Sequence, residues 1–178
     1  MADLTTKYLG LTLRNPIIIA SSGLTDSFEK IAELERNGAG AVVLKSLFEE
    51  QIILEADHNL KEALKNRLLY AEFSETLDYI DVHIREKELG RYLDIIKQVK
   101  KDLTIPLIAS VNCVSDIGWT GFAKQIEKAG ADALELNIFI MPFGFENNYD
   151  EREQKYYQIL RKVKQEINIP VAVKISPY

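Results

Sequence analysis

The sequence predicts an α/β protein with a parallel sheet, organised as a TIM (β/α)8 barrel of which this chain supplies about the first five strands. Three observations lead there. Five short apolar runs recur along the chain, helical segments separate most of them, and each run closes on a polar residue. Continuous apolar strands separated by helices are typical of a parallel sheet covered on both faces.

The five runs alternate in how they begin, with proline in the odd runs and Gly-Ala in the even ones. This alternation matches the layered interior of a barrel, and we expect inward layers of Ile18, Val43, Ile108, Leu136 and Val173. The rival fold, a doubly wound open sheet, usually has a glycine-rich phosphate turn after strand one, which Ser21-Ser22-Gly23 is not. The predicted strands are Ile17–Ala20, Ala41–Leu44, Leu107–Val111, Ala133–Ile138 and Val171–Ile175.

The connecting segments carry recognisable start and stop signals. Leu4–Leu13 alternates weakly around Leu9-Gly10, which predicts a short hairpin. Asp26 and Glu29 predict a helix start resembling a capping box. Glycines are expected to end two helices. The remaining predictions are a helix ended by Gly38, a helix over Arg91–Asp102, one after Trp119 ended by Gly130, and one over Asp150–Glu166.

The length suits one domain, residues 1–178, read as the N-terminal part of a barrel. A barrel needs eight strands and typically about 250 residues, so strands one and five should both be open edges. Residues 47–90 form a charge-rich insertion between strands two and three, with a helix expected across Leu60–Leu69.

Composition narrows the function classes. The chain is 47% apolar and 28% charged with a net charge of −5, which argues against a broad nucleic-acid surface. Its apolar runs are too short to span a membrane, and the N-terminus has no apolar signal core. One cysteine, Cys113, rules out an intramolecular disulfide. We therefore expect a reduced cytoplasmic protein.

Polar residues end all five strands, where α/β folds keep their chemistry. Two lysines beside amides and hydroxyls suit an electron-rich ligand that accepts hydrogen bonds, although a single lysine at a strand end is more often simply solvated. The residues are Ser21, Ser22, Lys45, Ser46, Asn112, Asn137 and Lys174.

These residues lie in motifs that resemble the flavin-dependent dihydroorotate dehydrogenases. The resemblance covers nearly the whole chain and is weakest over the insertion. The segment from Ile108 to Asn137 is also similar to the pyrimidine-reducing domain of dihydropyrimidine dehydrogenase. The motifs are Asn15-Pro16, Ser22-Gly23, Leu44-Lys45-Ser46, Ile108-Ala109-Ser110, the run from Ala131 to Asn137, and Val173-Lys174 followed by Pro177.

The resemblance implies FMN at the barrel mouth and oxidation of a dihydropyrimidine such as dihydroorotate to orotate, in pyrimidine biosynthesis. Lys45 and Asn137 would hold the substrate and act as the catalytic residues. We also expect a homodimer. The cofactor-binding residues implied are Ser21, Ser22, Gly23, Lys45, Ser46, Asn112, Asn137 and Lys174.

Two departures from the family pattern concern the catalytic base and the substrate loop. The family follows Glu-Leu-Asn with a cysteine or serine base, whereas residues 138–141 here offer no side chain that can accept a proton. The family's substrate loop after strand two is missing from residues 47–90. Cys113 as a replacement base is less favoured than a small semi-buried residue, and His58 and His83 are more simply surface histidines.

No metal site is predicted, because the spacing of Glu55, Asp57 and His58 fits no compact ligand pattern. Two alternatives to the flavin enzyme remain open. One is a flavin-free barrel lyase or isomerase that uses Lys45 or Lys174. The other is a catalytically inactive barrel fragment that only associates with partners.

Overall fold

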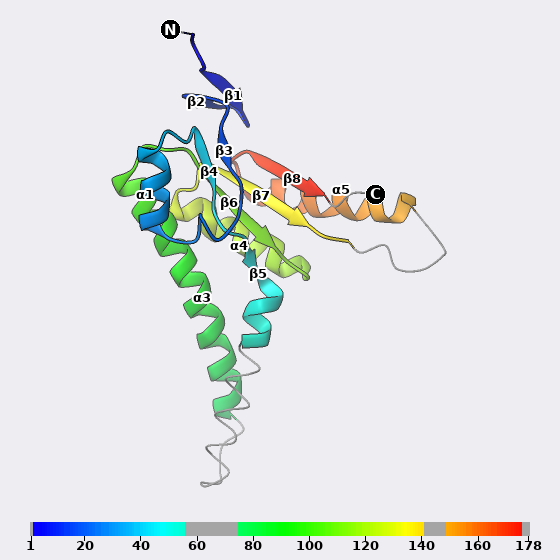
Figure 1. The fold of residues 1–178 in the computed structure, drawn as a ribbon. Helices are drawn as coiled ribbons and strands as arrows, with labels where there is room; N and C mark the ends of the chain where they lie inside the picture. The colour runs from blue at the N-terminus through cyan, green and yellow to red at the C-terminus, as the bar shows by residue number, and fades with distance from the viewer. Residues whose placement is uncertain (1, 56–74, 141–148, 176–178) are drawn as a thin grey trace.

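The computed structural model describes residues 2–55, 75–140 and 149–175. The central sheet is parallel throughout and runs in the order β3, β4, β6, β7, β8. It curls into an open half-barrel (Figure 1), which confirms the predicted fold. Within the described residues β3 and β8 each pair on one side only. The strands are β3 (Ile18–Ile19), β4 (Ala41–Val43), β5 (Leu47–Phe48), β6 (Leu107–Asn112), β7 (Ala133–Ile138) and β8 (Val171–Ile175).

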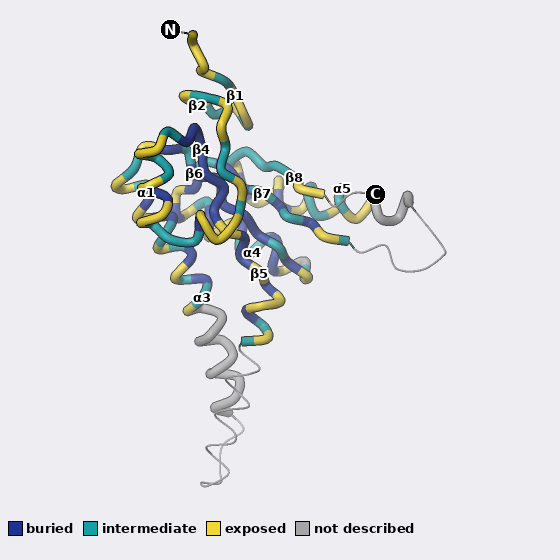
Figure 2. Tube along the Cα trace, in the orientation of Figure 1, coloured by how far each residue is buried: buried dark blue, intermediate teal, exposed yellow. Residues whose placement is uncertain are grey.

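The helices pack on the outer face of this sheet, where apolar side chains from both form the main core. In Figure 2 the dark blue of buried residues is concentrated on β4, β6 and β7. The Arg91–Asp102 prediction is the C-terminal half of a longer helix, and the Leu60–Leu69 prediction lies outside the described residues. The helices are α1 (Phe28–Arg36), α3 (Glu75–Asp102), α4 (Asp116–Ala129) and α5 (Tyr149–Glu166); residues 49–55 are also helical.

The start of α1 differs from the prediction. The residue before the helix is Ser27, whose side chain makes no capping bond. Asp26, expected to be the cap, instead pairs with Lys30 at 2.7 Å, one turn into the helix. The competing salt bridge therefore replaces the capping box.

The predicted hairpin is confirmed as β1 (Thr6–Tyr8) and β2 (Leu11–Leu13), paired antiparallel. Leu9 and Gly10 both have positive φ, at 52° and 76°, as a two-residue type I′ turn requires. Leu9 and Leu11 pack against the inner face of the sheet. The hairpin thus covers the N-terminal end of the half-barrel.

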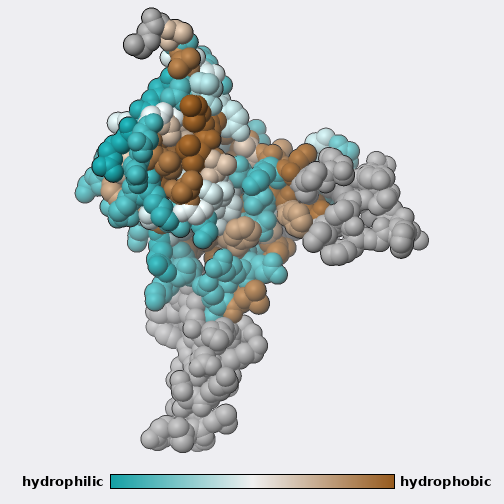
Figure 3. Space-filling view, viewed as in Figure 1, coloured by the Kyte–Doolittle hydropathy of each residue, from teal (hydrophilic) through white to brown (hydrophobic). Residues whose placement is uncertain are grey.

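The inner face has the predicted apolar layer, except that two of its five predicted members lie elsewhere. Val43, Ile108 and Ala133 are buried together and Ile18 packs against them. Leu136 and Val173 were expected here but belong to the helix-facing core. Side chains alternate along a strand, so Leu136, three residues after Ala133, must face the other way. On the side of the molecule shown in Figure 3, an apolar patch lies beside β3, where Ile17 and Leu24 are exposed.

The N-terminal end of the sheet is held by carboxylates at the ends of helices. Glu35 of α1 accepts hydrogen bonds from the backbone N–H groups of Thr104 and Ile105, each at 2.8 Å. Glu127 of α4 does the same for the N–H groups of Asn168 and Ile169, at 2.6 and 3.2 Å. Each acceptor lies three residues before a helix-ending glycine, and each pair of donors precedes the proline that opens a strand. The alternation of Pro and Gly-Ala in the sequence therefore corresponds to a repeated contact. In each case a carboxylate near the end of a helix binds the backbone just before a strand that begins with proline.

Candidate functional site

The inner face becomes polar toward the C-terminal ends of the strands. Above the apolar layer, Ser110 and Glu135 lie side by side in register, with Ala172 next to them on β8. One layer further along, Asn137 is in register with Lys174. Asn112 joins this layer, because its side-chain N–H donates to the Asn137 backbone oxygen at 2.7 Å. Three of the predicted site residues, Asn112, Asn137 and Lys174, are therefore brought together.

Four side chains in the middle layer form a continuous hydrogen-bonded chain. The Ser21 and Ser46 hydroxyls lie 3.1 Å apart, and the Ser46 and Ser110 hydroxyls 2.7 Å apart. Ser110 then donates to Glu135 Oε1 at 2.8 Å. Ser46 is only 8% exposed and Ser110 is fully buried. These hydrogen bonds thus connect the end of β3 to a carboxylate on β7 through the buried hydroxyls of Ser46 and Ser110.

A β-bulge brings Ser46 into this chain. Between its pairings with β6 as β4 and as β5, the polypeptide advances four residues, from Val43 to Leu47. Over the same stretch β6 advances only three residues, from Ile108 to Val111. The extra residue interrupts the ladder at Lys45-Ser46, and bulges of this kind often re-aim side chains near active sites. The Lys45 N–H donates to Thr25 at 3.1 Å, and the Ser46 N–H to the Ser21 hydroxyl at 2.9 Å. The predicted strand exit is therefore a bulge within a longer strand.

Tyr92 of α3 forms hydrogen bonds with the backbone N–H and carbonyl of Ser110, beside the bulge. Its hydroxyl donates to the Ser110 carbonyl and accepts from the Ser110 N–H, both at 2.9 Å. Complete burial raises the pKa of the Tyr92 hydroxyl; its hydrogen bond to Ser110 opposes this rise, and the negative charge of Glu135 adds to it. Tyr92 consequently stays neutral and can both donate and accept. Ser110 is held from behind while its side chain points to the inner face.

The loop after β3 contains a turn held by hydrogen bonds. The Thr25 N–H and hydroxyl both donate to the Ser22 carbonyl, at 3.1 and 3.0 Å, and Thr25 is fully buried. Lys30 donates to the Gly23 carbonyl at 2.7 Å. Ser22 and Gly23 are themselves exposed. The turn therefore presents these two residues, both predicted to bind cofactor, beside Ser21.

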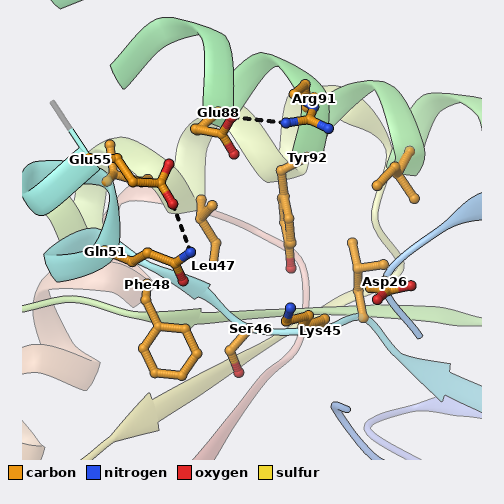
Figure 4. A pocket seen from close by; sticks show the side chains of 13 residues that line it. Asp26, Lys45, Ser46, Leu47, Phe48, Gln51, Glu55, Glu88, Arg91 and Tyr92 are labelled. Atoms are coloured by element: carbon orange, nitrogen blue, oxygen red, sulfur yellow. Dashed lines mark hydrogen bonds and ion pairs between the residues drawn. The ribbon is translucent and has the colours of Figure 1, made fainter. Parts of the chain in front are cut away.

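Lys45 is exposed and lines a cavity of about 310 Å³ between the sheet, α3 and residues 49–55. Figure 4 shows Phe48 and Ser46 pointing away from α3, with the Tyr92 ring reaching from α3 toward the strand. Arg91 is paired with Glu88 at 3.0 Å. Asp26 lies close enough to Lys45 for the ammonium to help lower its carboxyl pKa, after Lys30 as the main cause. Within the described residues, Lys45 forms no salt bridge.

The remaining candidates differ in where they lie. Cys113 belongs to the helix-facing core rather than the inner face. Burial and the nearby Glu49 carboxylate raise the pKa of its thiol, so it is not an activated nucleophile. Phe139 and Ile140 follow β7 with no titratable group. His58, Asp57 and the side chain of His83 lie outside the described residues.

Sequence reasoning missed three polar contributors, Ser110, Glu135 and Tyr92, as site residues. Ser110 and Glu135 each stand two residues before a predicted site residue, Asn112 and Asn137. The period of two along a strand could have placed each on the same face as its partner. Tyr92 carried no comparable signal, because a helical apolar stripe predicts only that it is buried.

Comparison with known proteins gives relatives along the whole chain. It is 28% identical over 99% of its length to the catalytic subunit of dihydroorotate dehydrogenase B (NAD(+)) of Thermoplasma volcanium. It is 24% identical over 98% of its length to the corresponding subunit of Methanocaldococcus jannaschii. It is 25% identical over 98% of its length to the NAD-dependent dihydropyrimidine dehydrogenase subunit PreA of Escherichia coli K12.

The chain spans about half the length of the curated relatives it matches: 55% of the Thermoplasma protein, 54% of the Methanocaldococcus protein and 42% of PreA. No protein-family model matches it. The predicted resemblance to dihydroorotate and dihydropyrimidine dehydrogenases is confirmed. Among the described helices, none combines the length and apolar character needed to cross a membrane.

Proposed function

We propose that the protein is a flavin-dependent oxidoreductase of the dihydroorotate dehydrogenase type, acting on a dihydropyrimidine. The observation that carries this proposal is similarity over 99% of the chain to a dihydroorotate dehydrogenase catalytic subunit. The polar layer at the C-terminal end of the sheet supports it, because this is where barrel enzymes build their active sites. The relatives are named as dehydrogenases, so oxidation and reduction form the reaction class proposed here.

FMN suits the donors at the C-terminal end of the sheet. Lys45 and Lys174 are exposed ammonium groups, and Asn112 and Asn137 supply amides in the layer of Lys174. A flavin ring is rich in carbonyl and nitrogen acceptors, and positive charge near it favours electron uptake. When bound, FMN would accept a hydride. Ser21, Ser22, Gly23 and Ser46 would contact it from the turn and the bulge.

The residues of this chain would orient the substrate and stabilise charge. Asn137 offers an amide that can pair with ring amides of a pyrimidine, and Lys45 offers a charge for a carboxylate. The proposal also includes the expected cytoplasmic location and homodimer. Oxidation of dihydroorotate to orotate would place the protein in pyrimidine biosynthesis.

The visible absorption spectrum of protein expressed from the complete reading frame tests the proposal. We expect copurified or added FMN to give a protein-perturbed flavin spectrum that bleaches anaerobically with dihydroorotate or dihydrouracil. A protein that never binds flavin would contradict the cofactor assignment. A flavoprotein that no dihydropyrimidine bleaches would contradict the substrate class.

A further inference from the structure

The chain of Ser21, Ser46, Ser110 and Glu135 has a fixed direction. A serine hydroxyl carries one proton and two lone pairs. Ser110 gives its proton to Glu135, so the bond between Ser46 and Ser110 must be donated by Ser46. Ser46 then has no proton left, and the bond between Ser21 and Ser46 must be donated by Ser21. Every hydroxyl therefore points toward the carboxylate.

The open end of this chain is an acceptor. The Ser21 oxygen already accepts the Ser46 N–H at 2.9 Å and gives its own proton to Ser46. One of its lone pairs is left. Ser21 is half-buried and lies beside the exposed Ser22 and Gly23. A proton arriving at Ser21 can thus pass inward, each hydroxyl releasing its own proton to the next.

We propose that Ser21, Ser46, Ser110 and Glu135 form a proton relay that accepts the proton released when the substrate is oxidised. This inference rests on the proposed function. The reaction needs such an acceptor, because making a C=C bond from two C–H bonds removes a hydride and a proton from adjacent carbons. The residues described after β7, Phe139 and Ile140, supply no base of their own.

One substrate C–H bond breaks and leaves its electron pair to form the new π bond, while the neighbouring hydride departs with its electron pair to the flavin. The released proton binds Ser21, the Ser21 proton moves to Ser46, and the Ser46 proton moves to Ser110. The Ser110 proton binds Glu135, which becomes a neutral carboxylic acid. Nothing is consumed apart from the substrate and the hydride acceptor.

Among the described residues, two lysines lie near the relay. Lys174 of β8 lies one layer above Glu135 on the same face, and Lys45 adjoins Ser46 at the bulge. From the helix side, the neutral Tyr92 hydroxyl binds the backbone of Ser110. The carboxylate end of the relay therefore has Lys174 on its own face of the sheet, and the hydroxyl that binds the backbone of Ser110 from the helix side carries no charge.

The first test measures anaerobic flavin bleaching by a dihydropyrimidine in H2O and D2O. Glu135→Gln keeps an oxygen that can accept the Ser110 bond but cannot take a proton, and Ser46→Ala cuts the chain in the middle. We expect each to slow bleaching by about 10²–10⁴-fold and to change the solvent isotope effect. The matched control is Glu35→Gln, a hydrogen-bonded carboxylate at the other end of the sheet, with the wild-type rate and isotope effect expected.

The second test needs no flavin. At low temperature, NMR of the flavin-free protein should show hydroxyl protons of Ser46 and Ser110 protected from exchange, because both side chains are buried. Glu135→Gln should move the Ser110 hydroxyl resonance upfield, since donation to a charge is replaced by donation to an amide. An unchanged resonance would overturn the direction assigned to the chain.

The outcomes separate the relay from the function beneath it. Bleaching of the wild type together with wild-type rates in both relay variants overturns the relay and leaves the proposed function standing. Slower bleaching with an unchanged solvent isotope effect also overturns the relay, because it would show that these residues only position other groups. A wild-type flavoprotein that no dihydropyrimidine bleaches overturns both.

Discussion

The two ends of the parallel sheet use similar residues in opposite ways. At the N-terminal end, Glu35 and Glu127 accept bonds from backbone N–H groups, and Asp132 binds Lys100 and the Leu107 N–H. At the C-terminal end, Glu135 accepts a hydrogen bond from the Ser110 hydroxyl, and Lys45 and Lys174 are exposed. Carboxylates on backbone donors fasten elements together, whereas a carboxylate on a hydroxyl chain can exchange protons.

The largest expected effect lies at the C-terminal end. Lys45→Ala should reduce turnover of the flavoprotein by about 10²–10³-fold, as removal of a group that stabilises developing charge typically does. Thermal stability should change little, since the side chain is exposed and has no salt bridge within the described residues. Lys97→Ala, which removes an exposed lysine paired with Asp94 on α3, is the control. Wild-type kinetics in Lys45→Ala would show that this lysine is a bystander.

Gly40→Ala should destabilise the N-terminal end of the sheet through a steric clash. An added Cβ would lie 2.2 Å from the Asn15 backbone oxygen and 3.1 Å from that of Ile17. The backbone has to shift, which we expect to cost about 1–3 kcal/mol of unfolding free energy. Gly121→Ala is the matched control, because nothing lies near its Cβ position. Equal urea midpoints for the two variants would contradict the close approach.

Asp132→Ala should destabilise the fold without touching the chemistry. The carboxylate accepts two bonds from Lys100, at 2.8 and 2.7 Å, and one from the Leu107 N–H at 2.8 Å. Losing hydrogen bonds to a charged group typically costs about 1.5–3 kcal/mol. Urea unfolding measures this loss, and the rate of flavin bleaching per folded molecule should be unchanged. A variant with normal stability but slower flavin bleaching would contradict the structural role assigned to Asp132 at the N-terminal end of the sheet.

The smallest expected effect is a pH dependence at Glu35. Burial raises the pKa of this carboxyl, but bonds from Thr104 and Ile105 outweigh it and leave the pKa below its ordinary value. A lowered folded-state pKa adds stability above the unfolded value, and that stability is lost as pH falls through the folded value. The advantage of wild type over Glu35→Gln in thermal melting should therefore be full near neutral pH and shrink in acid. A difference independent of pH would rule out this linkage.

Prediction from sequence worked where a local pattern dictates a local structure. Leu9-Gly10 predicted its hairpin turn, Gly130 its helix end, and Val171–Ile175 its strand, because each depends on backbone preference or periodicity. The bulge at Lys45-Ser46 could not be seen, since it depends on the register against β6. The roles of Tyr92 and Ser110 were hidden for the same reason: their bond joins residues that only the folded sheet brings together.

Titration with FMN shows directly whether the C-terminal end of the sheet is the flavin site. FMN is titrated into flavin-free protein expressed from the complete reading frame, and its visible spectrum is followed for wild type, for Lys45→Ala combined with Lys174→Ala, and for Glu35→Gln. We expect a saturable spectral change for wild type and Glu35→Gln that is strongly weakened in the double lysine variant. Equal binding by all three proteins, or no spectral change in any of them, would contradict it.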